Sequence, residues 1–295
     1  MTSLAPTAVD LVGNDTESVA LPASIPIERT WSLGRLLLLS LVFTYLALVL
    51  LFPLAALLGR ALDAGLSRII SELSAADALR GLAQSLVLAV IAVVANGMFG
   101  IAGALVLVRQ RFIGRQVLDA LVDLSLAVSP VITGLAFLLV FGRNGWLQPV
   151  LDALDISVAF AFPGLVICTV FVTLPFTLRE VSYVLEEIGT DEEEVAATLG
   201  ASAWTTFWRV TLPNVRHGLS LGITLTTARA LGEFGAVLVV GGAISGKTQT
   251  ATTFIYAASE ERQEAAAFGM ALILAILSML LLVVLERLKN RGKTS

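Results

Sequence analysis

The amino-acid sequence predicts an all-α, polytopic membrane protein with about six transmembrane helices. Apolar residues make up 57% of the 295 residues and charged residues only 14%, a balance far outside that of soluble domains. The apolar residues also gather in charge-free runs that reach membrane-spanning length, which takes about 20 residues of helix. The predicted spans cover approximately residues 36–58, 82–108, 117–141, 158–178, 218–240 and 265–285.

The segments outside these spans are short or polar. Residues 1–30 contain three prolines and scattered acids, and we expect a disordered cytoplasmic tail there. The first span is too long for the core of a secretory signal and lacks a basic start, so it should stay in the membrane. Residues 31–290 then form the membrane domain, and residues 291–295 form a short cytoplasmic C-terminal tail.

Helix breakers mark two of the spans. Ser129 and Pro130 fall in the middle of the third span, where a proline removes a backbone hydrogen bond and bends a helix. Pro163 and Pro175 are interpreted as the two ends of the fourth span. Asp119 and Asp123 open the third span near its boundary, and we expect them to reach water or to cap the helix.

The fifth span carries two charges inside an apolar helix. Arg229 and Glu233 are four residues apart and therefore share one helical face, which Gly222 and Thr226 extend. Each charge at a bilayer centre costs roughly 2.5–3.5 kcal/mol on insertion scales, so the two should pair or face water. A structural ion pair and a polar path with an anion-attracting arginine remain equally open interpretations.

Residues 179–217 form a polar, helix-prone segment between the fourth and fifth spans. Asp191 and the three glutamates after it precede small residues, which favours a helix with acids at its positive end. Gly200 should break this helix, and a second short helix should carry Trp204 and its aromatic neighbours until Leu212 and Pro213 end it. A helix–glycine–helix unit with one apolar side is suited to contact with another protein.

The distribution of Lys and Arg sets the expected orientation. With the N-terminus inside, twelve basic residues fall on the cytoplasmic side and six on the outer side, which favours both termini in the cytoplasm. The loop between the first two spans is the weak point, because it holds three of the six outer arginines. Residues 179–217 then face the cytoplasm.

The sequence offers little support for an enzyme. Cys168 and His217 are the only residues of their kinds, so no metal set or catalytic triad is present. The net charge of −4 provides no basic surface for nucleic acid. Residues 241–248 match the spacing of a phosphate-binding loop, but that loop requires a strand before it. Here a membrane span precedes it, so we interpret the match as chance.

Several motifs resemble those of one transporter family. The pattern Glu194-x-Ala196-x3-Gly200-x9-Val210-x-Leu212-Pro213 resembles the cytoplasmic "EAA" loop of permease subunits of ATP-binding-cassette (ABC) importers, with departures at Val195 and Val210. Residues 123–131, 141–146, 171–176 and 200–214 resemble the W-type sulfate/thiosulfate permeases. Residues 228–236 and 246–250 resemble a segment that sulfate, molybdate and tungstate permeases share. The resemblance covers approximately residues 35–290.

The resemblance implies a type I ABC importer permease (MetI-like) fold in the cell (inner or plasma) membrane. It implies a subunit of an ATP-driven sulfate/thiosulfate importer that is not itself an enzyme and needs no cofactor. The implied partners are two copies of an ABC ATPase, a second, T-type permease, an extracytoplasmic sulfate-binding protein and membrane lipid. A permease for another oxyanion, such as molybdate or tungstate, and an ATP-independent channel or carrier remain alternatives.

The same resemblance and the intramembrane charges together nominate two sets of site residues. The residues expected to couple to the ATPase are Glu194, Ala196, Gly200, Ala201, Ser202, Trp204, Leu212 and Pro213. The residues expected to line the translocation path are Arg229, Glu233, Thr226, Ser129 and Pro130.

Overall fold

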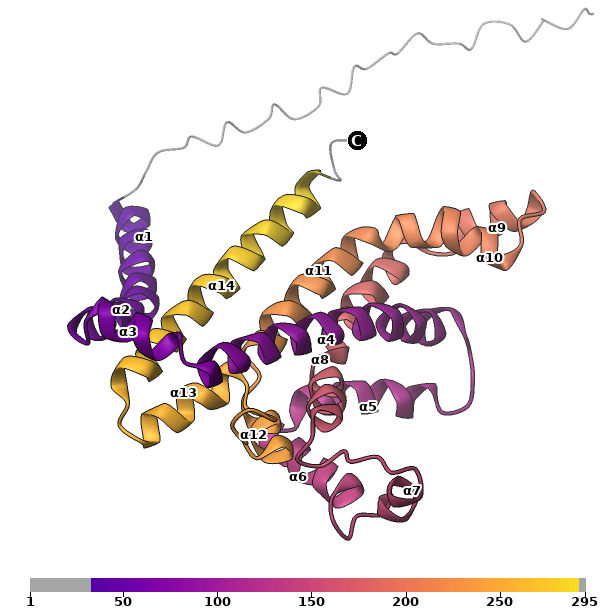
Figure 1. Cartoon of the computed structure of the whole chain (residues 1–295). Helices are drawn as coiled ribbons and strands as arrows, with labels where there is room; N and C mark the ends of the chain where they lie inside the picture. Colours follow the sequence, from indigo (N-terminus) through magenta and orange to yellow (C-terminus); the bar gives the residue numbers. More distant parts are fainter. Residues whose placement is uncertain (1–32, 292–295) are drawn as a thin grey trace, which may run out of the picture. The chain divides into compact units, whose positions relative to one another are not determined.

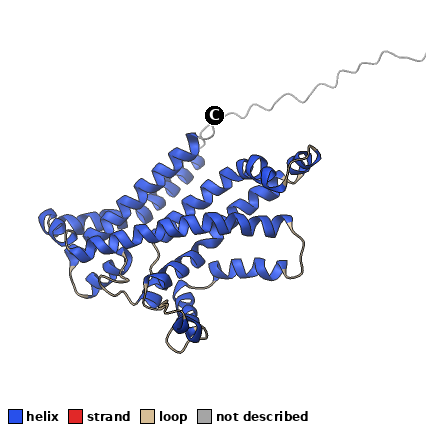
Figure 2. Cartoon of the chain, turned by 45° about the vertical axis from the view of Figure 1, so that its right-hand side comes forward, coloured by secondary structure: helices blue, strands red, loops and turns tan. Residues whose placement is uncertain are grey.

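The computed structural model describes residues 33–291, and every regular element among them is helical (Figures 1 and 2). The all-α prediction is therefore confirmed. The predicted N-terminal tail, residues 1–30, and residues 292–295 lie outside the described residues. The chain divides into two compact units, of which the first ends at Phe52 and the second begins at Pro53.

The first unit contributes α1 (Leu33–Leu46) and a π-helical turn, η1 (Ala47–Leu51). With α2 (Phe52–Asp63), these residues form a helical stretch that is long and apolar enough to cross a membrane. The stretch contains the predicted first span, residues 36–58. Nearly all of its leucines and its aromatic residues are exposed in the isolated chain, as expected for a helix that meets lipid.

The second unit holds the remaining helices. They are α3 (Leu66–Leu73), α4 (Ala76–Arg109), α5 (Arg115–Ala127), α6 (Pro130–Phe141), α7 (Gln148–Ala153), α8 (Phe162–Ile188), α9 (Asp191–Thr198), α10 (Ala203–Thr206), the π-helical turn η2 (Phe207–Thr211), α11 (Leu212–Leu231), α12 (Gly235–Gly241), α13 (Ala251–Glu260) and α14 (Glu264–Arg291). Of these, α4, α8 and α14 are each long and apolar enough to cross a membrane unaided.

Two of the six predicted spans are bent pairs of helices instead of continuous helices. α5 and α6 meet at 117°, and the helical stretch that ends with α11 meets α12 at 55°. The described residues thus supply four membrane-crossing helices, or six if each bent pair is one span. Pro130 explains the first break, because a proline disfavours helical backbone in the residue before it, and Ser129 is extended there.

The interpretation of Pro175 as the end of the fourth span is wrong. Pro163 does lie in the first turn of α8, where the missing N–H costs nothing, but Pro175 lies inside the helix and is buried. Prolines are tolerated within membrane helices because neighbouring helices and Ser or Thr side chains satisfy the freed backbone groups. The helix continues to Ile188, ten residues beyond the predicted span.

The core of the second unit lies where α4, α8 and α11 pack together. Asn96 of α4 donates a 2.7 Å hydrogen bond to the Oγ1 of Thr173, and the hydroxyls of Thr177 and Thr226 lie 2.9 Å apart. These side chains are all buried. Small residues let membrane helices approach closely and polar side chains then join them, so this contact fixes α8 against both neighbours.

Candidate functional site

The docking segment, residues 190–213, has the predicted helix–glycine–helix form. α9 begins with four acids and ends before Gly200, whose φ of +84° is the left-handed conformation that favours glycine. The N–H of Ala201 closes the turn on the carbonyl of Ala196 at 3.0 Å. The hydroxyl of Ser202 then caps α10 by accepting the N–H of Thr205. The local sequence thus dictates the shape of this segment.

The docking segment exposes an aromatic cluster. The Trp204 and Trp208 rings are in edge contact at 5.6 Å between centroids, and the Phe207 ring lies 5.3 Å from that of Trp208. Trp204 is 71% exposed and nearby Leu199 is 83% exposed. Figure 1 shows α9 and α10 at the outer end of the second unit, beyond the long helices. Exposed aromatic clusters of this kind are typical of protein contact sites.

The other side of the docking segment is anchored to the helix bundle. The Oε2 of Glu193 lies 3.1 Å from the Nε of Arg109, and its Oε1 accepts the hydroxyl of Thr211 at 2.8 Å. Arg109 also donates to the carbonyl of Leu185 at 3.1 Å. Sequence reasoning missed this anchor, because Arg109 and Glu193 are 84 residues apart in the chain.

The prediction that Leu212 and Pro213 end the second short helix is wrong. Residues Ala203–Leu231 form one helical stretch that passes from α10 through η2 into α11. Pro213 lies in the first turn of α11, directly after the π-helical turn. A wider turn changes the local hydrogen-bond pattern and accommodates the missing N–H of the proline. The docking segment is therefore continuous with the fifth span.

Arg229 and Glu233 form an ion pair at the break between α11 and α12. The Nη1 of Arg229 lies 2.6 Å from the Oε2 of Glu233. The expectation that both sit on one face of a continuous helix is wrong, because α11 ends at Leu231 and Glu233 lies in the break. Its Oε1 accepts the N–H of Ala236 at 3.2 Å, and its carbonyl accepts the hydroxyl of Thr252 at 2.7 Å.

The two helix breaks lie side by side. A Cβ built on Gly235 would come within 3.4 Å of the Cβ of Pro130 and 3.0 Å of a methyl group of Val131. Ser129 is exposed and its side chain forms no capping hydrogen bond. Four of the five predicted path residues therefore lie at two adjoining breaks.

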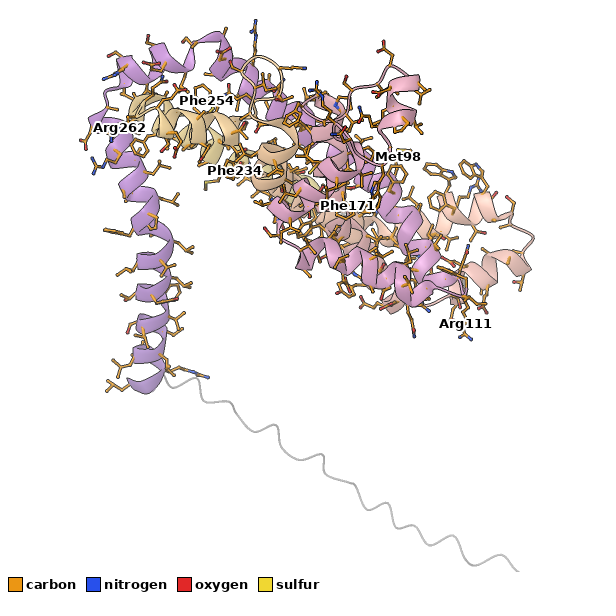
Figure 3. All side chains as sticks on the ribbon, turned by 90° about the horizontal axis from the view of Figure 1, so that it is seen from below. Met98, Arg111, Phe171, Phe234, Phe254 and Arg262 are labelled. Carbon is orange, nitrogen blue, oxygen red and sulfur yellow. The ribbon has the colours of Figure 1, made fainter. Side chains whose placement is uncertain are left out.

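The fifth predicted path residue, Thr226, lies elsewhere. It is fully buried, and its hydroxyl contacts that of Thr177 on α8. A role for Thr226 in the path stays a prediction. In Figure 3, Phe234 of the second break lies between Arg111 at one end of the unit and Arg262 at the other.

Asp119 and Asp123 have a partner that the sequence did not suggest. Arg179 of α8 contacts a carboxylate oxygen of each aspartate at 2.6 Å, and its Nη2 donates to the carbonyl of Asp119 at 3.1 Å. Both aspartates remain about half exposed, as expected for a boundary position. The cluster ties α5 to α8.

Nothing in the described part of the chain builds a metal centre or a nucleotide site. No group of three or more His, Cys, Asp or Glu side chains among the described residues is arranged to hold a metal ion. The phosphate-loop match follows a helix, α12, and the hydroxyl of Thr248 is used internally, donating to the carbonyl of Gly241 at 2.6 Å. The match lacks the strand that a phosphate-binding loop requires.

Comparisons with known proteins agree with this architecture. Residues 96–291 match the family described as "Binding-protein-dependent transport system inner membrane component". The chain is 43% identical over 265 residues to the sulfate transport system permease protein CysW of Synechococcus elongatus, covering 90% of this chain and 93% of that protein. It is 35% identical over 262 residues to the permease protein CysT of Escherichia coli (strain K12), covering 89% and 92% of the two chains.

A solved structure shows the same fold. A chain of the bacterial alginate ABC transporter superposes with a TM-score of 0.74 at 16% sequence identity, covering 90% of this chain and 96% of that chain. The likeness at this identity concerns the fold alone, which is the predicted fold of an ABC importer permease. The chain therefore belongs to the family of inner-membrane components of binding-protein-dependent transport systems.

Proposed function

We propose that this chain is the W-type permease subunit of an ATP-driven importer of sulfate and thiosulfate. The observation that carries the proposal is its similarity to a sulfate transport system permease protein across nine-tenths of its length. The similarity to both CysW and CysT proteins supports a complex in which this chain pairs with a T-type permease. Two ATPase copies inside and a sulfate-binding protein outside complete the complex.

The docking segment is the proposed contact with the ATPase. Its exposed aromatic cluster and its continuity with α11 support a role in passing ATPase motion into the membrane. The expected coupling residues lie within this segment, from Glu194 to Pro213. This role requires the segment, and both chain termini, to face the cytoplasm, as the distribution of basic residues favours.

The adjoining helix breaks are the proposed path for the oxyanion. A dianion needs positive charge or hydrogen-bond donors along its route through a low-dielectric medium. Arg229 supplies the charge and is 31% exposed, and the exposed hydroxyl of Ser129 supplies a donor. Substituting Arg229 with Gln should abolish sulfate uptake. Uptake is compared in assembled complex, because R229Q leaves the buried Glu233 without its charged partner. Normal uptake by assembled R229Q would show that the path does not use Arg229.

Uptake of radiolabelled sulfate tests the proposed function. Cells that lack this chain should lose uptake and should regain it when the chain is supplied with its partner subunits. A removal of the ATPase gene should abolish uptake as well. Uptake that persists without the ATPase would instead indicate a channel or carrier, and uptake that molybdate blocks at a lower concentration than unlabelled sulfate would indicate a permease for another oxyanion.

The contact with the ATPase has its own test with a matched control. Trp204→Ala removes an exposed aromatic anchor of the docking segment, and Trp146→Ala removes an 85%-exposed tryptophan elsewhere. Loss of an interface anchor typically costs 2 kcal/mol or more, so W204A should weaken ATPase retention by about 30-fold. W146A should retain the ATPase. Equal retention by the two variants would refute the docking role.

A further inference from the structure

Glu233 has the wrong sign for an anion path and is nevertheless deeply buried. It is the one buried acidic or basic residue among those whose side chains the structure describes, and its side chain is only 1% exposed. A buried carboxylate is costly unless it is paired. Its contacts with Arg229 and with the N–H of Ala236 offset that cost. A neutral side chain could accept the same N–H, so capping α12 does not by itself explain why a charge is buried here.

The ion pair is asymmetric. Glu233 occupies the buried side of Arg229, whereas the arginine side chain itself is 31% exposed. The short contact to Oε2 is not aligned as a hydrogen bond, and the described residues provide no other hydrogen-bond partner for Oε2. A guanidinium has five N–H donors. The arginine therefore retains donors on its open side that an oxyanion can use.

The carboxylate is tethered to the site, whereas a transported anion is not. A group held on the same short segment acts at an effective concentration in the millimolar range. A free monovalent anion carries the same single charge as this carboxylate, so its coulombic attraction to Arg229 at the same distance is no greater. A dianion gains about twice as much at the same distance. Thr252 holds the backbone of Glu233, and the N–H of Ala236 holds its Oε1, so the partly exposed arginine side chain is the partner that can move.

We propose that Glu233 is an internal competitor for Arg229, which excludes monovalent anions and yields the arginine to a divalent oxyanion. The empty ion pair is then neutral. An entering dianion binds the donors on the open side of Arg229 and draws the guanidinium away from the carboxylate, whose Oε1 keeps the N–H of Ala236. When the anion leaves, the guanidinium returns to the carboxylate, which prevents rebinding. This inference rests on the proposed function, because it assumes that a dianion passes Arg229.

The test uses the complete importer in proteoliposomes, with radiolabelled sulfate as substrate and sodium nitrate as the monovalent probe. Glu233→Gln removes the charge but keeps an oxygen that can accept the N–H of Ala236. E233Q should lower half-saturating sulfate at least about fivefold, which is the lower end of usual coupling between linked sites. It should also lower the maximal rate and make uptake sensitive to millimolar nitrate, whereas wild-type uptake should resist it.

Two further variants make the result decisive. Thr252→Val removes the hydrogen bond to the Glu233 carbonyl but leaves the carboxylate, and it should keep nitrate resistance. Glu233→Asp keeps the charge but shortens its reach, so E233D should show a partial gain of nitrate sensitivity even if E233Q fails to assemble. Unchanged nitrate resistance in assembled E233Q or E233D, or failure of both to assemble, would overturn the proposal. Wild-type complex without any sulfate uptake would instead refute the proposed function.

Discussion

Gly222 is a position in the helix core that should not tolerate one added methyl group. A Cβ at this position of α11 would lie 2.7 Å from the Cα of Thr177 and 3.3 Å from two of its side-chain carbons. The nearest atom belongs to the α8 backbone, which cannot rotate aside. Gly222→Ala must therefore push α11 away from α8 and stretch the 2.9 Å contact between Thr177 and Thr226.

The expected free energy follows from three terms. Overpacking a filled interface costs about 1–3 kcal/mol. Loss of one interhelical hydrogen bond in a membrane protein costs about 0.6 kcal/mol on average. The gain in helix propensity on replacing Gly with Ala offsets about 1 kcal/mol. The net loss is about 0.6–2.6 kcal/mol, with overpacking as the deciding contribution.

The assay is the thermal stability of the purified complex, with Gly97→Ala as the matched control. Gly97 lies on α4 with no atom within 4 Å of its hypothetical Cβ, so G97A should gain helix propensity without any clash. G222A should lower the apparent Tm by roughly 1–10 °C, since about 1 kcal/mol shifts Tm by about 2–4 °C in chains of about 150–250 residues. A G222A complex as stable as G97A would refute the close approach of α11 and α8.

Other substitutions probe the remaining contacts. Glu193→Gln removes the charge that holds the docking segment to Arg109, and sulfate-stimulated ATP hydrolysis should become partly uncoupled from uptake; tight coupling in E193Q would contradict an anchoring role. Arg179→Lys cannot contact Asp119 and Asp123 together with the same geometry, which should loosen α5 from α8. Proteolysis at residues 110–114, which lead into α5, should then become faster, as measured by mass spectrometry of the fragments. Thr248→Val removes the hydroxyl that donates to the Gly241 carbonyl and should lower the free energy of unfolding by about 1–3 kcal/mol. The measurement is a fall in Tm, which Thr248→Ser should largely avoid because serine keeps the hydroxyl.

The sequence predicted the elements that depend on local pattern. The long apolar runs gave α4 and α14 because hydropathy alone requires a helix of membrane-spanning length. The turn of the docking segment was predictable from Gly200. A tight turn between two helices requires a positive φ, which glycine adopts most readily. These features need no knowledge of distant residues.

The sequence did not predict the features that depend on tertiary contact. Pro175 and Pro213 look like helix ends by pattern, yet both lie inside helical stretches because neighbouring helices and a π-helical turn accommodate them. The partners of Arg179 lie 56 and 60 residues away in the chain, so no spacing reveals them. The four-residue spacing of Arg229 and Glu233 predicts one helical face but does not indicate where the helix ends. The position of Glu233 in the break after α11 was therefore missed.

The π-helical turn that joins α10 to α11 has a mechanical consequence. A single helical stretch, Ala203–Leu231, runs from the exposed tryptophans to the turn that carries Arg229 of the ion pair. At 1.5 Å per residue, these 29 residues make a lever arm of about 43 Å. A tilt of about 5° pivoting at one end of such an arm moves the other end by roughly 4 Å, about the width of a small ion. A small tilt of the docking segment can thus be amplified at Arg229 by the helix itself, without any signal passing from side chain to side chain.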